Sequence, residues 1–66
     1  MILRFTTKRD TNGNRYTLDI DTDNKLFSYG YNTAHYYGEH ITITKAERKR
    51  MIGELIADDF ASVDRL

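Results

Sequence analysis

The chain contains no cysteine and no proline, and its charges cancel. Without cysteine it can form neither a disulfide nor a thiolate metal site. Ten lysine and arginine residues balance ten aspartate and glutamate residues, so the formal net charge is zero. This balance argues against a strongly basic nucleic-acid binder and against an acidic mimic of DNA.

Long apolar runs are also missing from the sequence. No segment approaches the roughly 20 apolar residues that a membrane-spanning helix needs, and no apolar signal-peptide segment follows Met1. We therefore expect a soluble protein of the cytoplasm with no membrane partner.

The chain is short, and its 66 residues are expected to form a single domain, residues 1–66. A domain of this size buries only about 60% of the surface that its extended chain exposes. Five tyrosines and three phenylalanines are present, and so small a core cannot easily hide all eight rings. Some of the rings are therefore expected on the surface.

The sharpest local signal is the pair Asn12-Gly13. Both residues tolerate the positive φ that a type I′ hairpin turn requires. The segments on either side, residues 2–9 and 15–21, alternate with the period of two that is typical of half-buried antiparallel strands. The chain is therefore predicted to open with a β-hairpin. Its apolar side is predicted to consist of Leu3, Phe5, Tyr16, Leu18 and Ile20.

A second turn is indicated by residues 21–24, because Asp and Asn tolerate left-handed φ and cap their own backbone. The strand after it is predicted over residues 25–31, and its parity is ambiguous, since a slip of one residue reverses its faces. Phe27, Tyr29 and Tyr31 are assigned to the helix-facing side because they carry the larger apolar area.

One helix is predicted near the end of the chain. Thr44 and Glu47 form a capping box at its start, in which each side chain binds a free backbone amide. The helix is predicted to end near Asp58, because carboxylates at a helix C-terminus oppose the helix dipole. Residues 60–63 are left open between a short strand and a tail, with Phe60 folded back onto the core.

Residues 40–44 alternate again and predict a short fourth strand with Ile41 and Ile43 directed inward. The expected fold class is α+β: an antiparallel three- to four-stranded β-meander packed on one C-terminal α-helix. The predicted packing places the helix residues Ile52, Leu55 and Ile56 against Leu18, Ile20 and Ile43.

Residues 32–40 show no clean period, and the loop from Gly30 to His40 is the leading candidate for a binding loop. Tyr36 and Tyr37 cannot both point inward from an extended segment, so at least one ring should be exposed, as is typical of binding surfaces. The alternative is that one ring packs on the sheet edge and the other lies flat on the surface. The residues predicted to contact a protein partner are Tyr31, His35, Tyr36, Tyr37, Arg48 and Arg50.

Cations crowd the first half of the predicted helix, where they oppose the helix dipole. A phosphate backbone or an acidic partner would give this placement a functional reason, and ordinary solvated charges are the alternative. A second basic strip is predicted on the side of the sheet opposite to Phe5 and Tyr16. The candidate residues for nucleic-acid binding are Arg4, Lys8, Arg15, Lys45 and Lys49.

Metal and catalytic sites find little support in the sequence. His35, Glu39 and His40 fit no zinc spacing, and a fourth ligand is missing. The acidic residues within 19–23 begin like a calcium-binding loop, but the required glycine and bidentate glutamate do not follow at their positions. No nucleophile stands in an activating context. We therefore expect no catalytic residue, no metal and no cofactor, and a protein that is not an enzyme.

The order of three antiparallel strands followed by one helix resembles the small DNA-binding domains of integrase amino termini and of AP2-type factors. In that class the exposed face of the sheet enters the major groove. This resemblance, which concerns topology, implies sheet-mediated DNA binding.

The strand-turn-strand run from Lys8 to Leu18, with a capped helix near the end of the chain, is similar to short proteins of phages and mobile elements of Gram-positive bacteria. This resemblance implies no catalytic residue and a host-directed partner, such as a defence complex or a transcription component. We predict a non-enzymatic module that acts by protein–protein contact, with DNA binding as the alternative. A homodimer is also an open alternative, since one sheet edge looks unprotected.

Overall fold

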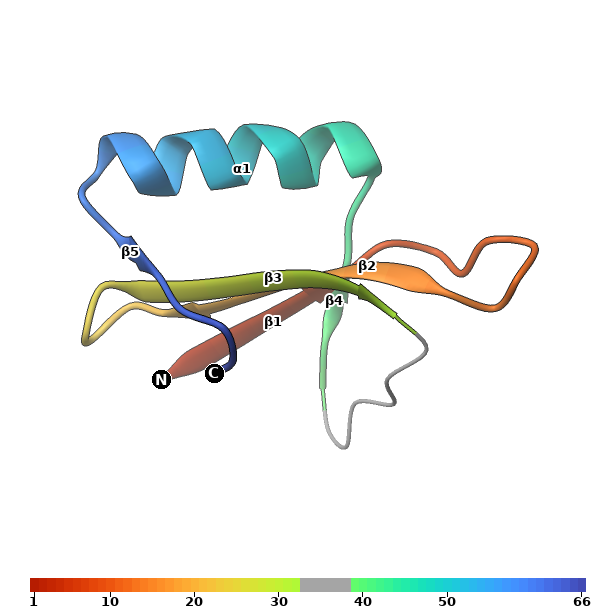
Figure 1. Ribbon diagram of the computed structural model, residues 1–66, viewed down its shortest axis with the longest axis horizontal. Coiled ribbons are helices and arrows are strands. Elements are labelled where there is room, and N and C mark those ends of the chain that lie inside the picture. Colours follow the sequence, from red (N-terminus) through yellow and green to blue (C-terminus); the bar gives the residue numbers. More distant parts are fainter. Residues whose placement is uncertain (33–38) are drawn as a thin grey trace.

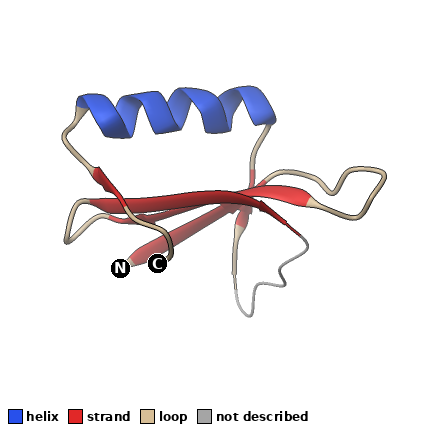
Figure 2. Ribbon diagram, viewed as in Figure 1, coloured by secondary structure: helices blue, strands red, loops and turns tan. Residues whose placement is uncertain are grey.

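A computed structural model describes residues 1–32 and 39–66. In this part of the chain the helix lies over one face of a single sheet, so that the molecule has two layers (Figures 1 and 2). The predicted α+β class, with mostly antiparallel strands and one C-terminal helix, is confirmed. The elements are β1 (Ile2–Thr6), β2 (Arg15–Asp21), β3 (Leu26–Asn32), β4 (Ile41–Thr42), α1 (Lys45–Ala57) and β5 (Ala61–Ser62).

The strands are ordered β4-β1-β2-β3-β5 across the sheet. The three central strands form the predicted antiparallel meander, whereas β4 pairs in parallel with β1 and β5 in parallel with β3. The segment left open between strand and tail is therefore a strand. The bonds that hold it include those from the Ala61 amide to the Lys25 carbonyl (2.9 Å) and from the Val63 amide to the Phe27 carbonyl (2.8 Å).

The first hairpin has a longer loop than the predicted type I′ turn, and that prediction is wrong. Gly13 has a φ of +80°, but Asn12 is not among the residues with positive φ. The Gly13 amide donates to the Asp10 carbonyl (3.0 Å), and the Asp10 carboxylate accepts bonds from the amides of Asn12 (2.9 Å) and Asn14 (3.0 Å). Because Asp10 satisfies the loop amides, the hairpin needs a left-handed residue only at Gly13.

The second turn is built around Asp21. Its carboxylate accepts bonds from the amides of Asp23 (3.1 Å) and Asn24 (3.2 Å) and from the Asn24 side chain (2.9 Å). The left-handed residue is Lys25, with a φ of +53°. β3 consequently begins one residue later than predicted.

The register of the sheet gives the parity of β3. Leu3, Ile20 and Phe27 form one cross-strand row, and Leu18 lies opposite Tyr29. The predicted assignment of Phe27, Tyr29 and Tyr31 to the helix side is thereby confirmed. The buried core consists of Leu18, Ile20, Phe27 and Leu55, and the residues packed around it are Leu3, Phe5, Met51, Ile52 and Phe60.

Two residues predicted to point inward do not. Ile56 is 61% exposed, because it is turned by about 100° around the helix from Leu55, which faces the sheet. Ile41 is 55% exposed, because β4 is a two-residue edge strand. Ile43 is half-buried and lies outside the core cluster of the described residues.

The predicted capping box is confirmed. The Glu47 amide donates to the Thr44 hydroxyl (3.0 Å), and the Thr44 amide donates to the Glu47 carboxylate (3.1 Å). The helix ends at Ala57 with Asp58 as its C-cap, as predicted. Within residues 1–32 and 39–66 no helix combines the length and the apolar character that crossing a membrane requires.

Candidate functional site

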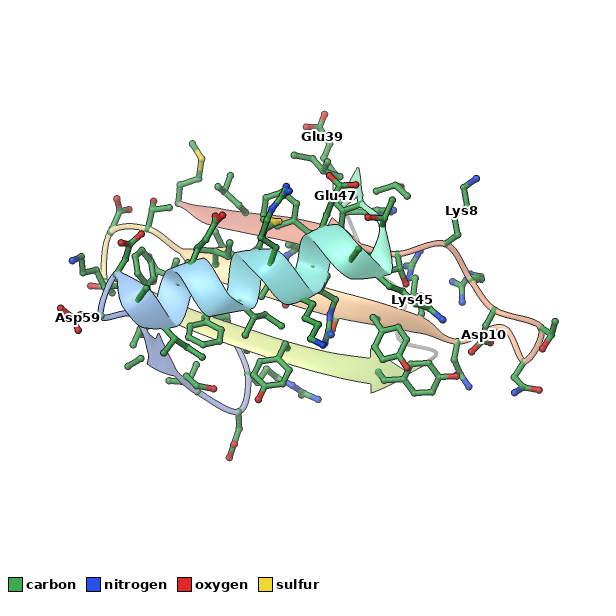
Figure 3. All side chains as sticks on the ribbon, turned by 90° about the horizontal axis from the view of Figure 1, so that it is seen from above. Lys8, Asp10, Glu39, Lys45, Glu47 and Asp59 are labelled. Atoms are coloured by element: carbon green, nitrogen blue, oxygen red, sulfur yellow. The ribbon has the colours of Figure 1, made fainter. Side chains whose placement is uncertain are left out.

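The two flanks of α1 differ in chemistry. Figure 3 shows Lys45 on the side of β3 and Glu47 on the side of β1. Lys49 and Ile52 follow Lys45 at helical spacing and share its flank. Together with Tyr16 and Arg48, these three residues line a hollow of about 280 Å³ between the helix and the sheet. We call this hollow, formed by Tyr16, Lys45, Arg48, Lys49 and Ile52, the α1–β3 groove.

Two exposed rings continue the groove along β3. Tyr29 is 53% exposed and Tyr31 is 44% exposed, although both belong to the helix-facing side of the sheet. In Figure 3 α1 and β3 overlap at the C-terminal end of the helix and diverge toward its N-terminal end, so the helix does not cover this part of β3. The rings of Tyr16, Tyr29 and Tyr31 therefore form an aromatic floor of the groove, beside the basic flank of α1.

Arg48 joins the helix to the floor of the groove. Its Nε donates to the Thr17 carbonyl (3.0 Å) and its Nη2 to the Gly30 carbonyl (3.3 Å). Its Cζ lies 4.9 Å from the centre of the Tyr16 ring and 5.5 Å from that of Tyr29. Thr17 and Gly30 are paired across β2 and β3. The Thr17 side chain belongs to the other face and Gly30 has no side chain, which leaves their carbonyls accessible from the helix side. Arg48 therefore fixes the two rings and the helix relative to one another.

The hairpin loop is attached to the same floor. The rings of Tyr16 and Tyr31 lie 4.6 Å apart, and the Tyr31 hydroxyl donates a hydrogen bond to the Asp10 carboxylate. This bond is the main reason that the pKa of Asp10 is lowered and the pKa of Tyr31 is raised. Lys45 Nζ lies 5.3 Å from the centre of the Tyr16 ring and also lowers the pKa of Asp10.

The groove is positively charged. Neither Lys45 nor Lys49 has a carboxylate within ion-pair distance among residues 1–32 and 39–66. Asp10 is the nearby acidic group that acts on Lys45. Three cationic side chains, Lys45, Arg48 and Lys49, therefore lie near one carboxylate, that of Asp10. This excess of positive charge favours an acidic ligand.

The residues predicted to bind a protein are only partly brought together. Tyr31 and Arg48 belong to the groove region, but the Arg48 guanidinium is engaged with the sheet. Arg50 is turned by about 100° around the helix from Lys49 and is not among the residues that line the groove. Its Nε lies 3.9 Å from a Glu54 carboxylate oxygen. The remaining predicted contacts, His35, Tyr36 and Tyr37, lie outside the described residues.

The residues predicted to bind nucleic acid do not form one surface. Arg4 and Arg15 lie on the sheet face away from α1, as predicted, but both are half-buried. Arg4 Nη1 is 3.4 Å from an oxygen of Asp19, which is itself buried. Lys8 is an exposed residue of the hairpin loop. The other two candidates, Lys45 and Lys49, belong to the α1–β3 groove.

The sequence pattern missed the role of Tyr29, Lys49 and Ile52 in one site. The spacing of Lys45, Lys49 and Ile52 predicts a shared helix flank. That this flank faces β3 depends on how α1 crosses the sheet, and the sequence pattern does not report the crossing.

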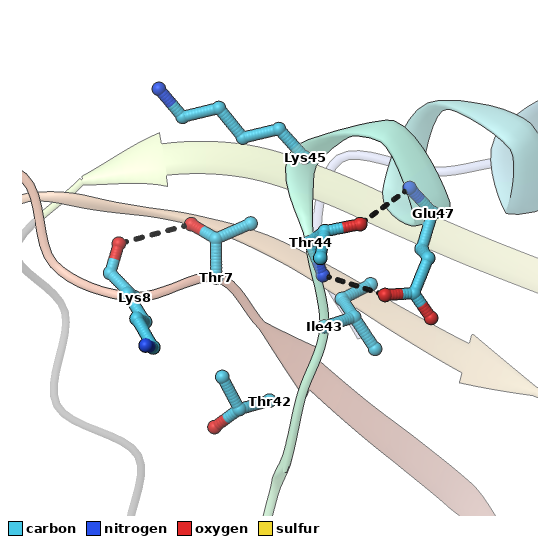
Figure 4. A pocket seen from close by; sticks show the side chains of 7 residues that line it. All are labelled: Thr7, Lys8, Thr42, Ile43, Thr44, Lys45 and Glu47. Carbon is cyan, nitrogen blue, oxygen red and sulfur yellow. Dashed lines mark hydrogen bonds between the residues drawn. The ribbon is translucent and has the colours of Figure 1, made fainter.

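A second hollow, of about 420 Å³, lies at the start of α1 (Figure 4). Three of its lining side chains already make hydrogen bonds, because Thr7 donates to the Lys8 carbonyl (3.3 Å) and the Thr44 and Glu47 side chains form the cap. The hydrogen bond from the Thr44 amide lowers the pKa of Glu47, so a carboxylate remains at the mouth of the hollow. Lys8 and Lys45 line the same hollow, and none of its described lining residues is aromatic, so it lacks the stiff contact surface of the α1–β3 groove.

Within the part of the chain that the structure describes, no cluster of three or more acidic or histidine side chains is placed to hold a metal ion. No protein-family model, no curated protein and no solved structure matches this chain. The α1–β3 groove is therefore interpreted from its own geometry.

Proposed function

We propose that this chain is a small non-enzymatic binding module that recognises a protein partner through the α1–β3 groove. The observation that carries the proposal is the gathering of exposed tyrosines and lysines on one flank of the helix. Tyrosine offers a large, stiff contact area with few torsions to freeze, which makes it common at the centre of protein interfaces. Charges at the rim of such a patch favour association with an oppositely charged partner.

The groove is preorganised for binding. Arg48 holds the Tyr16 and Tyr29 rings from the helix side, and Asp10 holds the Tyr31 hydroxyl from the loop side. A partner therefore meets rings whose positions are already restricted, so little further entropy is lost on association.

The physical causes of the shifted carboxyl pKa values support a non-enzymatic role. Perturbed pKa values often mark catalytic groups. In this chain those of Asp10, Asp21 and Glu47 are lowered by hydrogen bonds that build a loop, a turn and a helix cap. The altered acidities thus have structural explanations.

The resemblance to short phage and mobile-element proteins supports a host protein, in a defence or transcription complex, as the partner. DNA binding through the outer sheet face is less well supported. That face carries Asp19 and Asp21 beside Arg4, and its central residues Thr17, Asp19 and Ser28 are buried. DNA needs an exposed basic surface to contact its phosphates.

The test is affinity capture from a bacterial lysate, with and without nuclease, using three versions of the full chain. Lys49→Glu reverses a charge in the groove. Arg50→Glu reverses a charge at the next residue, which lies outside the groove lining on the same helix, and is the matched control. Circular dichroism establishes that all three chains are folded.

We expect wild type and Arg50→Glu to retain the same partner after nuclease treatment and Lys49→Glu to lose it. Equal retention by the two variants would show that the groove is not the contact surface. A partner that disappears with nuclease, and whose retention falls steeply with salt, would support DNA binding instead.

A further inference from the structure

Within residues 1–32 and 39–66, the edge of β3 beside the α1–β3 groove is only partly paired. β5 pairs with β3 only at Leu26 and Phe27, and after β5 the chain turns under the sheet (Figure 1). Among residues 1–32 and 39–66, nothing pairs with this edge at Tyr29 or Tyr31.

The alternation of the strand shows which backbone groups this edge presents. The carbonyls of Lys25 and Phe27 accept bonds from β5, so the odd-numbered residues of β3 direct their amides and carbonyls outward. Tyr29 and Tyr31 therefore present outward-facing backbone donors and acceptors directly beside their own exposed rings. Such an edge is a ready template for an added strand.

We propose that the partner of this module binds as an extended acidic segment that adds a strand to the β3 edge and directs acidic side chains to Lys45 and Lys49. This inference rests on the proposed function, because it specifies how the groove would hold its protein partner. The added strand would exchange backbone hydrogen bonds with Tyr29 and Tyr31. Its side chains on the helix side would lie beside the two tyrosine rings.

The spacing of the two lysines suits such a strand. Residues four apart on a helix are separated by about 6 Å along its axis, and side chains on one face of a strand repeat every ~6.7 Å. In Figure 3 the Lys45 end of α1 lies beside β3 rather than over it, with Lys45 on the β3 side. Two acidic residues in alternate positions of the added strand therefore match the spacing of Lys45 and Lys49. The segment is thus expected to alternate acidic residues with residues of high strand propensity.

An acidic segment fits this edge better than a second copy of the chain does. Two copies paired through β3 would bring two basic groove flanks together around Gly30, and like charges in close contact oppose association. An acidic strand instead meets two lysines that have no ion-pair partner among the described residues.

The experiment uses the full chain and three synthetic peptides. The probe peptide alternates glutamate with valine. One control carries N-methyl groups on the amides of alternate residues, which keeps the charge and removes the strand hydrogen bonds along one edge. It is made in two registers, methylated at either the odd-numbered or the even-numbered residues of the peptide. The other control alternates lysine with valine. Binding is followed by amide NMR shifts, and hydrogen exchange is measured at the Tyr29 and Tyr31 amides.

We expect the glutamate peptide to bind and to slow exchange at Tyr29 and Tyr31 by about 100-fold at a peptide concentration about 100 times its Kd. One register of the methylated peptide should bind much more weakly, and the lysine peptide should not bind. Replacing Lys45 and Lys49 by Gln should weaken binding about 2- to 30-fold, as expected for two exposed ion pairs. Arg50→Gln should leave binding unchanged.

Other outcomes overturn the inference. Binding without protection of Tyr29 and Tyr31 would exclude strand addition. Protection that rises with protein concentration alone would identify a second copy as the occupant. If no acidic peptide binds while the lysate capture is still lost in Lys49→Glu, the groove binds its partner in another mode, and only this inference fails. If the capture also proves insensitive to Lys49→Glu, the proposed function fails with it.

Discussion

Replacing Arg48 by methionine should destabilise the domain, because the Arg48 guanidinium joins α1 to two strands of the sheet. Methionine keeps an unbranched stem of similar reach and removes the guanidinium. The change deletes two hydrogen bonds, to the Thr17 and Gly30 carbonyls, and two ring contacts.

The magnitude follows from these four contacts. A net hydrogen bond contributes about 1 kcal/mol, and a cation–π contact at a partly exposed site contributes about 0.5–1 kcal/mol. Because the side chain is only half-buried, solvent screens part of this sum. We therefore expect a loss of about 2 kcal/mol, against a total stability of roughly 3–10 kcal/mol for a chain of this length.

The assay is thermal and urea denaturation followed by circular dichroism. A loss of about 2 kcal/mol should lower Tm by about 8–16 °C in so small a domain. The matched control is Arg50→Met on the same helix, which removes one exposed pair with Glu54 and should change Tm by less than about 4 °C. Equal Tm values for the two variants would refute the structural role of Arg48 and return it to the candidates for direct partner contact.

Three further predictions concern the core, the first loop and acid stability. Leu55→Ala should lower the free energy of unfolding, measured by urea denaturation, by about 2–5 kcal/mol. Ile56→Ala should lower it by less than about 1 kcal/mol, because the Ile56 side chain is 61% exposed. Equal losses would mean that α1 docks by another face. Gly13→Ala should cost about 1–2 kcal/mol through backbone conformation alone, because φ is +80° and an added Cβ meets nothing within 4 Å; unchanged stability would contradict the left-handed loop. The Asn24 bonds lower the pKa of Asp21 below its ordinary value of 3.8, so their stabilisation is complete above that value and is lost as the pH falls through the folded-state pKa. Asn24→Ala should therefore reduce the loss of stability between about pH 6 and about pH 3, and an unaltered acid profile would assign that loss to other groups.

Sequence patterns predicted the elements that depend on interactions between residues close together in the chain. The capping box needs only Thr44 and Glu47 at a separation of three residues, and the strands of the first hairpin show their period of two within a few residues. The prediction of the turn itself failed at Asn12. The loop conformation depends on the Asp10 carboxylate as well as on the glycine, and the Asn12-Gly13 pair does not report that bond.

The parity of β3 could be argued from apolar area, but only the register to β2 decided it. Both added edge strands are parallel to their neighbours, which no local period reveals, because parallel pairing joins distant segments of the chain. The exposure of Ile56 likewise depends on which part of the helix circumference meets the sheet.

The sequence by itself determined the class of this protein: a small α+β domain with balanced charge, a first hairpin and a capped helix. These properties follow from composition, periodicity and short-range hydrogen bonding. The tertiary structure alone decided the candidate site. Tyr16, Tyr29 and Lys49 are far apart in the chain. They share one surface because α1 crosses the sheet at an angle to β3 and leaves the later part of that strand uncovered. The crossing is set by the packing of Leu55 onto Leu18, Ile20 and Phe27, a long-range contact that no single segment encodes.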